Sequence, residues 1–337
     1  MASFNNSTEI DYTSYSIPLY ETVTSRTIKF ILILICQLLS ISCSIFLLFH
    51  LITKATLYRA LHNHTIIALV IVSFFQTISD LPMSLDYLRI GQASSSIFCL
   101  MWNFFALSNY AVGIWVMTWA SLERHLLIFH DHLIGTFRRK ILFHYIPLIA
   151  FLFIPWIYYV ILIFFYPCTN YFYQTLLFCG WCCYAYNDQL VFFNWLAVGI
   201  VPTCSISLLS LGLIVRVIRQ KRRVQQRINW RQHRRMIIQL LSISCLYIFF
   251  DAPTVLIGLI RLSLPTFAMD IQIQYLFYIV YLLPLLVPFI CLSTLRELWS
   301  KNRTRIHPTM PFTQSHTTRR NPQTINIKSH VVQTTKL

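Results

Sequence analysis

The chain has 337 residues, of which 56% are hydrophobic and only 11% are charged, and its formal net charge at pH 7 is +16. An average soluble domain has about 25% charged residues, so this composition excludes an ordinary water-soluble fold. A large positive charge can indicate nucleic-acid binding. Here, however, the basic residues lie between long neutral runs, which favours a membrane protein with no nucleic-acid partner.

Seven apolar runs predict seven membrane-spanning helices, since most of them reach the roughly 20 residues that cross a bilayer core. The runs are 30–53, 60–79, 90–122, 141–187, 189–215, 236–260 (interrupted by one Asp) and 271–295. The run 141–187 is long enough for two spans, but its second half holds Pro167, Asn170, Gln174 and four cysteines. We interpret it as one helix from 141 to about 166, followed by a loop.

The distribution of basic residues predicts the orientation of these spans. With seven spans, the segments 54–59, 124–140, 216–235 and 296–337 fall on one side of the membrane and carry 23 of the 27 Lys and Arg residues. The other side carries Arg26, Lys29, Arg89 and Arg261. By the positive-inside rule the basic side is cytoplasmic, and the N-terminus is external.

We expect an all-α seven-helix bundle over 28–300, between an extracellular segment 1–27 and a disordered cytoplasmic tail 301–337. The first 27 residues lack an apolar core, so no cleavable signal peptide is expected. Ser293 to Ser300 could form a short interfacial helix. Overlapping N-x-[ST] sequons predict glycosylation at Asn5 and Asn6. Chance is the alternative, because Asn63 and Asn302 match the same pattern on the cytoplasmic side.

Five cysteines lie on the predicted external side, where disulfides can form. They are Cys99, Cys168, Cys179, Cys182 and Cys183. A bridge from Cys99, at the start of the third span, to the loop after the fourth would fasten that loop over the mouth of the bundle. We predict the pair Cys99 and Cys183, with Cys168 and Cys179 as a plausible second pair. The odd number leaves one thiol over, and the sequence does not fix the pairing.

Arg124 lies 25 residues after Cys99, which corresponds to roughly 37 Å of helix and a full membrane crossing. It is flanked by Glu123 and His125. An Arg beside a Glu at a helix end can be held by an ion pair in one state of a bundle and freed in another. The simpler alternative is an Arg that extends its charge to the membrane boundary.

Asp80 and Asp251 are carboxylates within spans, where an unpaired charge costs several kcal/mol. We predict that both line a central pocket near Tyr110 of the third span; the alternative for each is a structural hydrogen bond. Trp115 points about 140° away from Tyr110 around the helix, so we expect it to pack outward.

The combined pattern resembles the rhodopsin-like G-protein-coupled receptors over about residues 28–300. The resemblance rests on seven spans, an external N-terminus, Cys99 one crossing before Glu123-Arg124-His125, an external-loop cysteine, and characteristic prolines in the last three spans. These prolines are Pro202, Pro253 and Pro288. The resemblance implies that Glu123 and Arg124 form a cytoplasmic lock and that Arg124 contacts a heterotrimeric G protein.

The sequence departs from that family in several positions, in the style of divergent peptide-receptor-like members seen in invertebrates. Ser73 replaces a sodium-binding Asp, Asp251 replaces a Trp, and His125 replaces a Tyr. The seventh span reads Val287-Pro288-Phe289-Ile290-Cys291 where the family has Asn-Pro and a closing Tyr. Ala106 stands at the position where amine receptors carry an Asp, which disfavours a monoamine ligand.

The sequence therefore favours a plasma-membrane receptor that binds an extracellular ligand, such as a neuropeptide, and activates a heterotrimeric G protein. The basic residues Arg231, Arg234 and Arg235, before the sixth span, would then face the G protein or anionic lipid. The alternative is a transporter or channel that uses Asp80 and Asp251. An enzyme is not expected, because the chain has no H-E-x-x-H motif and its one C-x-x-C lies in a loop without an adjacent His. No metal or cofactor is expected.

Overall fold

The computed structural model describes residues 22–55, 61–129, 136–223, 230–264 and 267–294, and within these ranges it is helical, with no strand. Seven helical spans are long and apolar enough to cross a membrane, as predicted. Four of them are single helices. These are α1 (Val23–Thr53), α3 (Leu61–Ile90), α4 (Ser96–Phe129) and α9 (Trp230–Ser263).

The fourth, fifth and seventh spans are each built from several helical pieces. The fourth comprises α5 (Phe137–Lys140), the π-helical turn η3 (Ile141–Tyr145), α6 (Ile146–Val160) and η4 (Ile161–Phe165). The fifth comprises α7 (Asp188–Asn194), η7 (Trp195–Ile200) and α8 (Val201–Arg223). The seventh comprises α10 (Met269–Ile271), η8 (Gln272–Leu276), α11 (Phe277–Val280) and α12 (Leu282–Thr294).

Two of the π-helical turns have a cause in the sequence. Pro147 follows η3 and Pro202 follows η7. A proline has no N–H and its ring clashes with the carbonyl four residues earlier. That carbonyl belongs to Phe143 inside η3 in the first case and to Val198 inside η7 in the second. A local change of hydrogen-bond register at these turns accommodates the missing donor.

The second span extends further than the neutral run predicted. The neutral run ends at residue 79 and Asp80 was predicted to lie within the span near its end, yet α3 continues through Asp80 and Asp86 to Ile90. Each carboxylate has a partner that allows the helix to continue. Asp80 accepts a hydrogen bond from Tyr281, and Asp86 pairs with Arg89 one turn later at 3.3 Å. A charge with a partner does not end a helix.

The outer surface of the bundle is apolar. Large hydrophobic side chains such as Leu32, Phe49, Phe153, Leu208 and Phe249 are exposed. Soluble proteins rarely expose contiguous apolar surface on this scale, whereas a bilayer solvates it favourably. The chain is therefore a multi-pass membrane protein.

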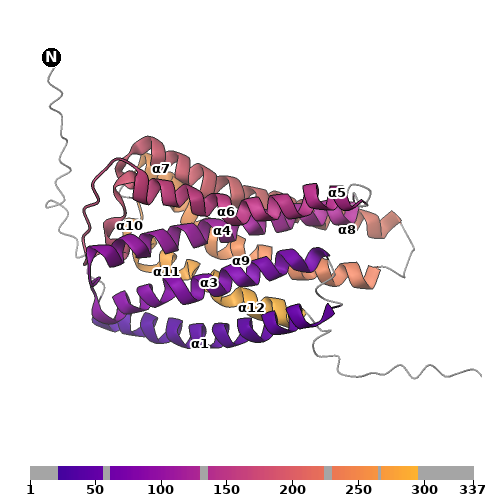
Figure 1. The fold of residues 1–337 in the computed structure, drawn as a ribbon, viewed down its shortest axis with the longest axis horizontal. Helices are drawn as coiled ribbons and strands as arrows, with labels where there is room; N and C mark the ends of the chain where they lie inside the picture. The colour runs from indigo at the N-terminus through magenta and orange to yellow at the C-terminus, as the bar shows by residue number, and fades with distance from the viewer. Residues whose placement is uncertain (1–21, 56–60, 130–135, 224–229, 265–266, 295–337) are drawn as a thin grey trace, which may run out of the picture. The chain divides into compact units, whose positions relative to one another are not determined.

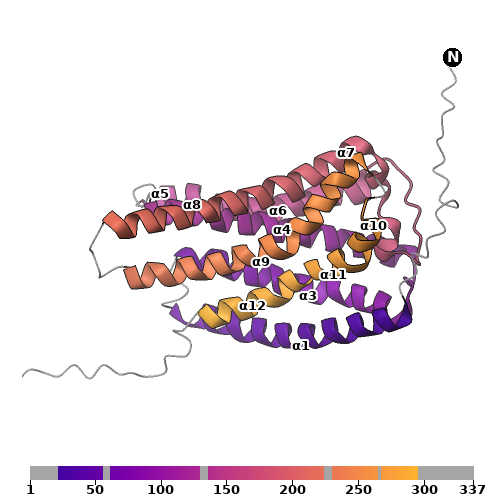
Figure 2. The same ribbon diagram turned by 180° about the vertical axis from the view of Figure 1, so that it is seen from behind.

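Helix α4 is the central element of the bundle. It packs against α3, α6, α8 and α9, and Figures 1 and 2 show it running among these helices. The successive spans alternate in direction, so we name the two ends of the bundle after α4. The Cys99 end also carries the loop 166–187, and the Arg124 end carries the turn from α5 to η3.

The loop 166–187 is fastened to the bundle by a disulfide, but the predicted pairing is wrong. Cys99 bonds to Cys179, and Cys168 bonds to Cys183. Cys179 reaches α4 because the loop folds inward there. Asn103 of α4 donates a hydrogen bond to the carbonyl of Phe178 at 2.8 Å. Tyr87 donates to the carbonyl of Thr175 at 3.0 Å, which fixes the preceding turn on α3.

Cys183 instead returns toward the start of the loop. The side chain of Asn170 accepts a hydrogen bond from the Cys183 backbone N–H at 2.8 Å. This hydrogen bond holds the end of the loop beside its start, where Cys168 lies. Cys182 is left as a buried thiol. The predicted sites Asn5 and Asn6, the tail 301–337 and residues 295–300 of the predicted interfacial helix lie outside the described residues.

Disulfide mapping by mass spectrometry of the non-reduced protein tests this arrangement. We expect peptides that join Cys99 to Cys179 and Cys168 to Cys183. Burial raises the pKa of the Cys182 thiol to about 12. At pH 8 only about one thiol in ten thousand is then the reactive thiolate, so iodoacetamide should modify Cys182 only after unfolding. A peptide that joins Cys99 to Cys183, or rapid labelling of native Cys182, would contradict the structure.

A cavity and a buried polar cluster at opposite ends of α4

A cavity of about 320 Å³ lies among the spans beneath the loop 166–187. Its walls combine aromatic and polar side chains from α3, α4, the loop, the fifth span, α9 and the seventh span. The aromatic members include Tyr110, Phe178, Trp181, Trp195, Phe277 and Tyr281. The polar members include Gln76, Asp80, Asn194, Thr254, Arg261 and Gln272. The π-helical turns η7 and η8 supply Trp195 and Gln272, so the altered register of these spans helps to shape the cavity.

Asp80 lies in the wall of this cavity, as predicted, and is almost fully buried. Its Oδ1 accepts a hydrogen bond from the Tyr281 hydroxyl at 3.1 Å. Ser84 donates to the Tyr281 oxygen at 2.6 Å, and Trp102 donates to Ser84 at 3.2 Å. This chain of donors stabilises negative charge on one oxygen of the carboxylate. The other oxygen, Oδ2, accepts no hydrogen bond of good geometry among the described residues, and Gln76 and Trp102 are the other side chains that interact with the carboxylate.

Asp251 has different surroundings from Asp80, although both carboxylates were predicted to line the central pocket. The Tyr110 hydroxyl donates to its Oδ1 at 2.5 Å, and the Thr203 hydroxyl donates to its Oδ2 at 2.8 Å. Both oxygens are therefore engaged, and Asp251 joins α9 to α4 and α8. Tyr110 lines the cavity, whereas Asp251 is not part of the wall. The structural alternative fits Asp251 best.

The segment of the loop above the cavity is strained. Phe178, Cys179, Gly180 and Trp181 all have positive φ, between 52° and 80°. A residue other than glycine in a sparsely populated backbone region costs on the order of 1–3 kcal/mol, and such strain clusters at binding and switch sites. The disulfide to Cys99 and the hydrogen bond from Asn103 hold this conformation. As a result Phe178 and Trp181 are directed into the cavity wall.

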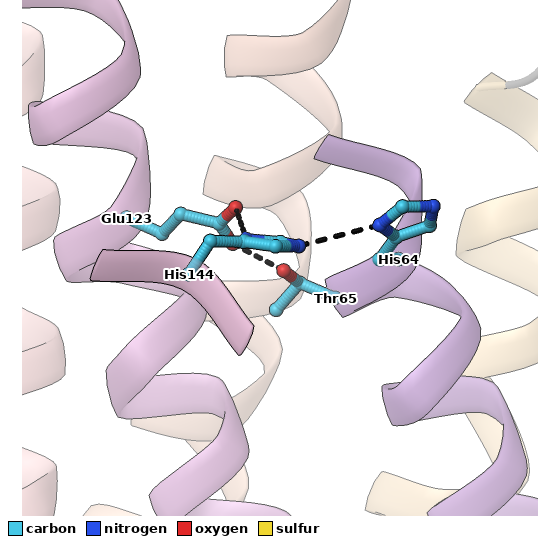
Figure 3. A network of polar contacts seen from close by, with 4 residues as sticks. All are labelled: His64, Thr65, Glu123 and His144. Carbon is cyan, nitrogen blue, oxygen red and sulfur yellow. Dashed lines mark hydrogen bonds and ion pairs between the residues drawn. The ribbon is translucent and has the colours of Figure 1, made fainter. Parts of the chain in front are cut away.

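At the opposite end of α4, Glu123 is the centre of a buried polar cluster (Figure 3). Its Oε1 lies 2.6 Å from His144 Nδ1, and both side chains are fully buried. Thr65 of α3 donates a hydrogen bond to its Oε2. His144 Nε2 lies 3.3 Å from Nδ1 of His64. A neutral imidazole has one donor and one acceptor, so His144 can contact His64 and the carboxylate at once. The contact between His144 Nδ1 and Oε1 is close in distance but does not have hydrogen-bond geometry.

Arg124 and His125 follow Glu123 in the same buried turn of α4. Arg124 is 1% exposed, which differs from the alternative of an Arg extended to the membrane boundary. His125 Nε2 donates to the carbonyl of Leu209 at 2.7 Å, and the imidazole ring packs beside Gly212 one turn later. Sequence reasoning paired the Glu123 carboxylate with Arg124. The two charges do interact, and the carboxylate oxygens also contact His144 and Thr65 on other helices.

Three residues of the Glu123 cluster, His64, Thr65 and His144, were missed by sequence reasoning. His144 is a polar residue within the apolar run 141–187, which is a signal of a buried contact but does not name the partner. Trp115 behaves as predicted: it stacks on Phe151 of α6 with ring centroids 5.2 Å apart, and the cavity wall does not include it.

No protein-family model matches the chain, and no curated protein matches it significantly. The structure itself shows a seven-span membrane protein with a cavity at the Cys99 end and a buried polar cluster at the Arg124 end.

Replacing His144 by Ala should destabilise the protein, because it removes one of the two partners of a fully buried carboxylate. Loss of one partner of a buried pair costs about 3–5 kcal/mol. His64→Ala is the matched control and should cost about 1 kcal/mol, since it removes only a hydrogen bond between imidazoles. The free energy of unfolding can be measured by SDS titration in mixed micelles. Equal effects of the two variants would contradict the described cluster.

Proposed function

We propose that the chain is a G-protein-coupled receptor at the plasma membrane. In this proposal an extracellular ligand, such as a peptide, occupies the cavity beneath the loop 166–187, and a heterotrimeric G protein engages the Arg124 end. The protein would act by binding and conformational change rather than as an enzyme.

The observation that carries the proposal is the arrangement along α4. One end of this helix contributes Cys99 and Asn103, which anchor the strained loop, and Tyr110, which lines the cavity. The other end contributes Glu123, Arg124 and His125, all of them buried. A ligand that changes the packing at one end of a rigid helix can bias a two-state contact at the other end, which is what a transmembrane receptor requires.

Two features of the Arg124 end support engagement of a partner there. Polar groups buried near the boundary of a membrane bundle mark sites that change state, since their burial is costly. The exposed basic residues Arg138, Arg139 and Lys140 of α5 at this end also fit the positive-inside rule for a cytoplasmic face. The resemblance to rhodopsin-like receptors assigns the G-protein contact to Arg124, and the neighbouring contact of His125 with α8 would position that turn.

Coexpression of the protein with a panel of G-protein reporters tests this proposal, with basal and ligand-stimulated signalling as the readout. Arg124→Ala should lower the signal at least about tenfold, because it removes the cation that would contact the G protein. Arg138→Ala is the matched control, since it removes an exposed positive charge from the same end of the bundle, and it should retain the signal within about twofold.

The amount of protein at the cell surface must be measured in the same cells, because Arg124 is buried. Arg124→Lys keeps the charge and serves as a second variant if Arg124→Ala does not reach the surface. Normal signalling by Arg124→Ala at normal surface level would overturn the coupling role of Arg124. Ion or solute flux that depends on Asp80, without any G-protein signal, would favour the transporter or channel alternative instead.

A further inference from the structure

The cavity has an electrostatic asymmetry that defines the ligand it can hold. Among the described side chains of its wall, Asp80 is the carboxylate and Arg261 the guanidinium. Arg261 lies in the last turn of α9, at the mouth of the bundle, and donates to the side chain of Gln272 at 2.5 Å. Asp80 lies ten residues before the end of α3, which corresponds to about 15 Å of helix below that mouth.

The two oxygens of Asp80 differ in their surroundings. The Tyr281 hydroxyl donates to Oδ1, and its own oxygen accepts a hydrogen bond from Ser84. Oδ2 accepts no hydrogen bond of good geometry in the described part of the chain, although the carboxylate is almost fully buried and the side chains of Gln76 and Trp102 lie close enough to interact with it. A buried carboxylate is most stable when it is paired with a cation, and no cationic side chain is paired with Asp80 among the described residues.

The aromatic part of the cavity wall also favours a cationic ligand. Phe178, Trp181 and Phe277 form a packed aromatic group, with ring centroids 4.9 Å apart for Phe178 and Trp181 and 5.5 Å apart for Trp181 and Phe277. Aromatic faces attract alkylammonium groups more strongly where water is excluded. An inorganic cation would need several oxygen ligands at once. Gln76, Thr254 and Gln272 also bring oxygens to the wall, so Na⁺ is included as a competing cation in the test.

We propose that the cavity selects ligands that carry a protonated amine and that this amine pairs with Oδ2 of Asp80. In the bound ligand the amine lies at the deep end of the cavity, because Arg261 at the mouth repels a cation and attracts the acceptor groups at the other end of the ligand. A peptide N-terminus has this polarity, and its amine would meet a carboxylate on α3 instead of the third-span position that Ala106 occupies. The inference rests on the proposed ligand-binding role of the cavity and specifies the chemistry of that ligand.

A set of three small probes of nearly equal size tests the proposal directly. They are 2-phenylethylammonium, which is a cation at about pH 7, the neutral 2-phenylethanol, and the anion phenylacetate. Binding to the purified full-length protein in neutral detergent is measured by the ligand-dependent rise of the thermal unfolding midpoint. We expect the cation to bind at least about tenfold more tightly than the alcohol and the anion to bind most weakly. Equal binding of the cation and the alcohol overturns the proposal.

Asp80→Asn keeps an acceptor for Tyr281 and removes the charge. It should weaken binding of 2-phenylethylammonium at least about tenfold and leave binding of 2-phenylethanol within about twofold. Asp86→Asn is the matched control, because it removes the same charge from the same helix outside the cavity wall, and it should bind the cation like the wild type. An equal loss in both variants overturns the assignment to Asp80.

Two further arms distinguish the remaining outcomes. Replacement of KCl by NaCl at equal ionic strength tests an inorganic cation; an Asp80-dependent stabilisation by Na⁺ as large as that by the ammonium probe overturns the proposal. The probe comparison on the wild-type protein decides the ligand class even if Asp80→Asn folds poorly.

Receptor function is tested separately by G-protein signalling. Selective amine binding without such signalling would refute the receptor function and leave the amine site standing.

Discussion

Polar groups that are buried within an apolar bundle must find partners on neighbouring helices, and the central helix α4 carries several of these groups. In lipid no water can satisfy them. Asn103 holds the loop carbonyl of Phe178, Tyr110 donates to Asp251 of α9, and Glu123 contacts α3 and η3. These contacts fix the rotation and depth of α4, and its apolar neighbours pack around that frame.

The two ends of α4 meet this constraint differently. At the Arg124 end, Glu123 contacts Thr65 and His144 on other helices, and His144 contacts His64. At the Cys99 end, Oδ2 of Asp80 accepts no hydrogen bond of good geometry and the loop from Phe178 to Trp181 is strained. Backbone strain and incomplete pairing at the cavity are costs that a bound ligand can relieve.

The number and order of the spans could be predicted from the sequence because they depend on hydropathy and charge, which are local. Asp80 and Tyr110 as cavity residues were also predictable, since a carboxylate within a span demands an explanation. The partners were not predictable. Asp251 is engaged by Thr203, and Glu123 by His144 and Thr65, because of how the helices rotate against each other.

The disulfide pairing shows the same limit. Cys179 and Cys183 are only four residues apart, and the choice between them depends on the inward turn at Phe178, which Asn103 holds. Gly180 was the sole local sign of that turn, since three of the four residues with positive φ there are not glycine. The π-helical turns follow a clearer rule, because Pro147 and Pro202 lie directly after two of them.

The central claim is that the cavity and the Arg124 end are coupled through α4. Thermodynamic linkage makes this measurable: a G protein bound at one end must change ligand affinity at the other by the same factor. The most direct test is the affinity of 2-phenylethylammonium for the protein in nanodiscs, with and without nucleotide-free heterotrimeric G protein. The account predicts a change of at least about fivefold with one class of Gα subunit. An unchanged affinity with every class of Gα would contradict it.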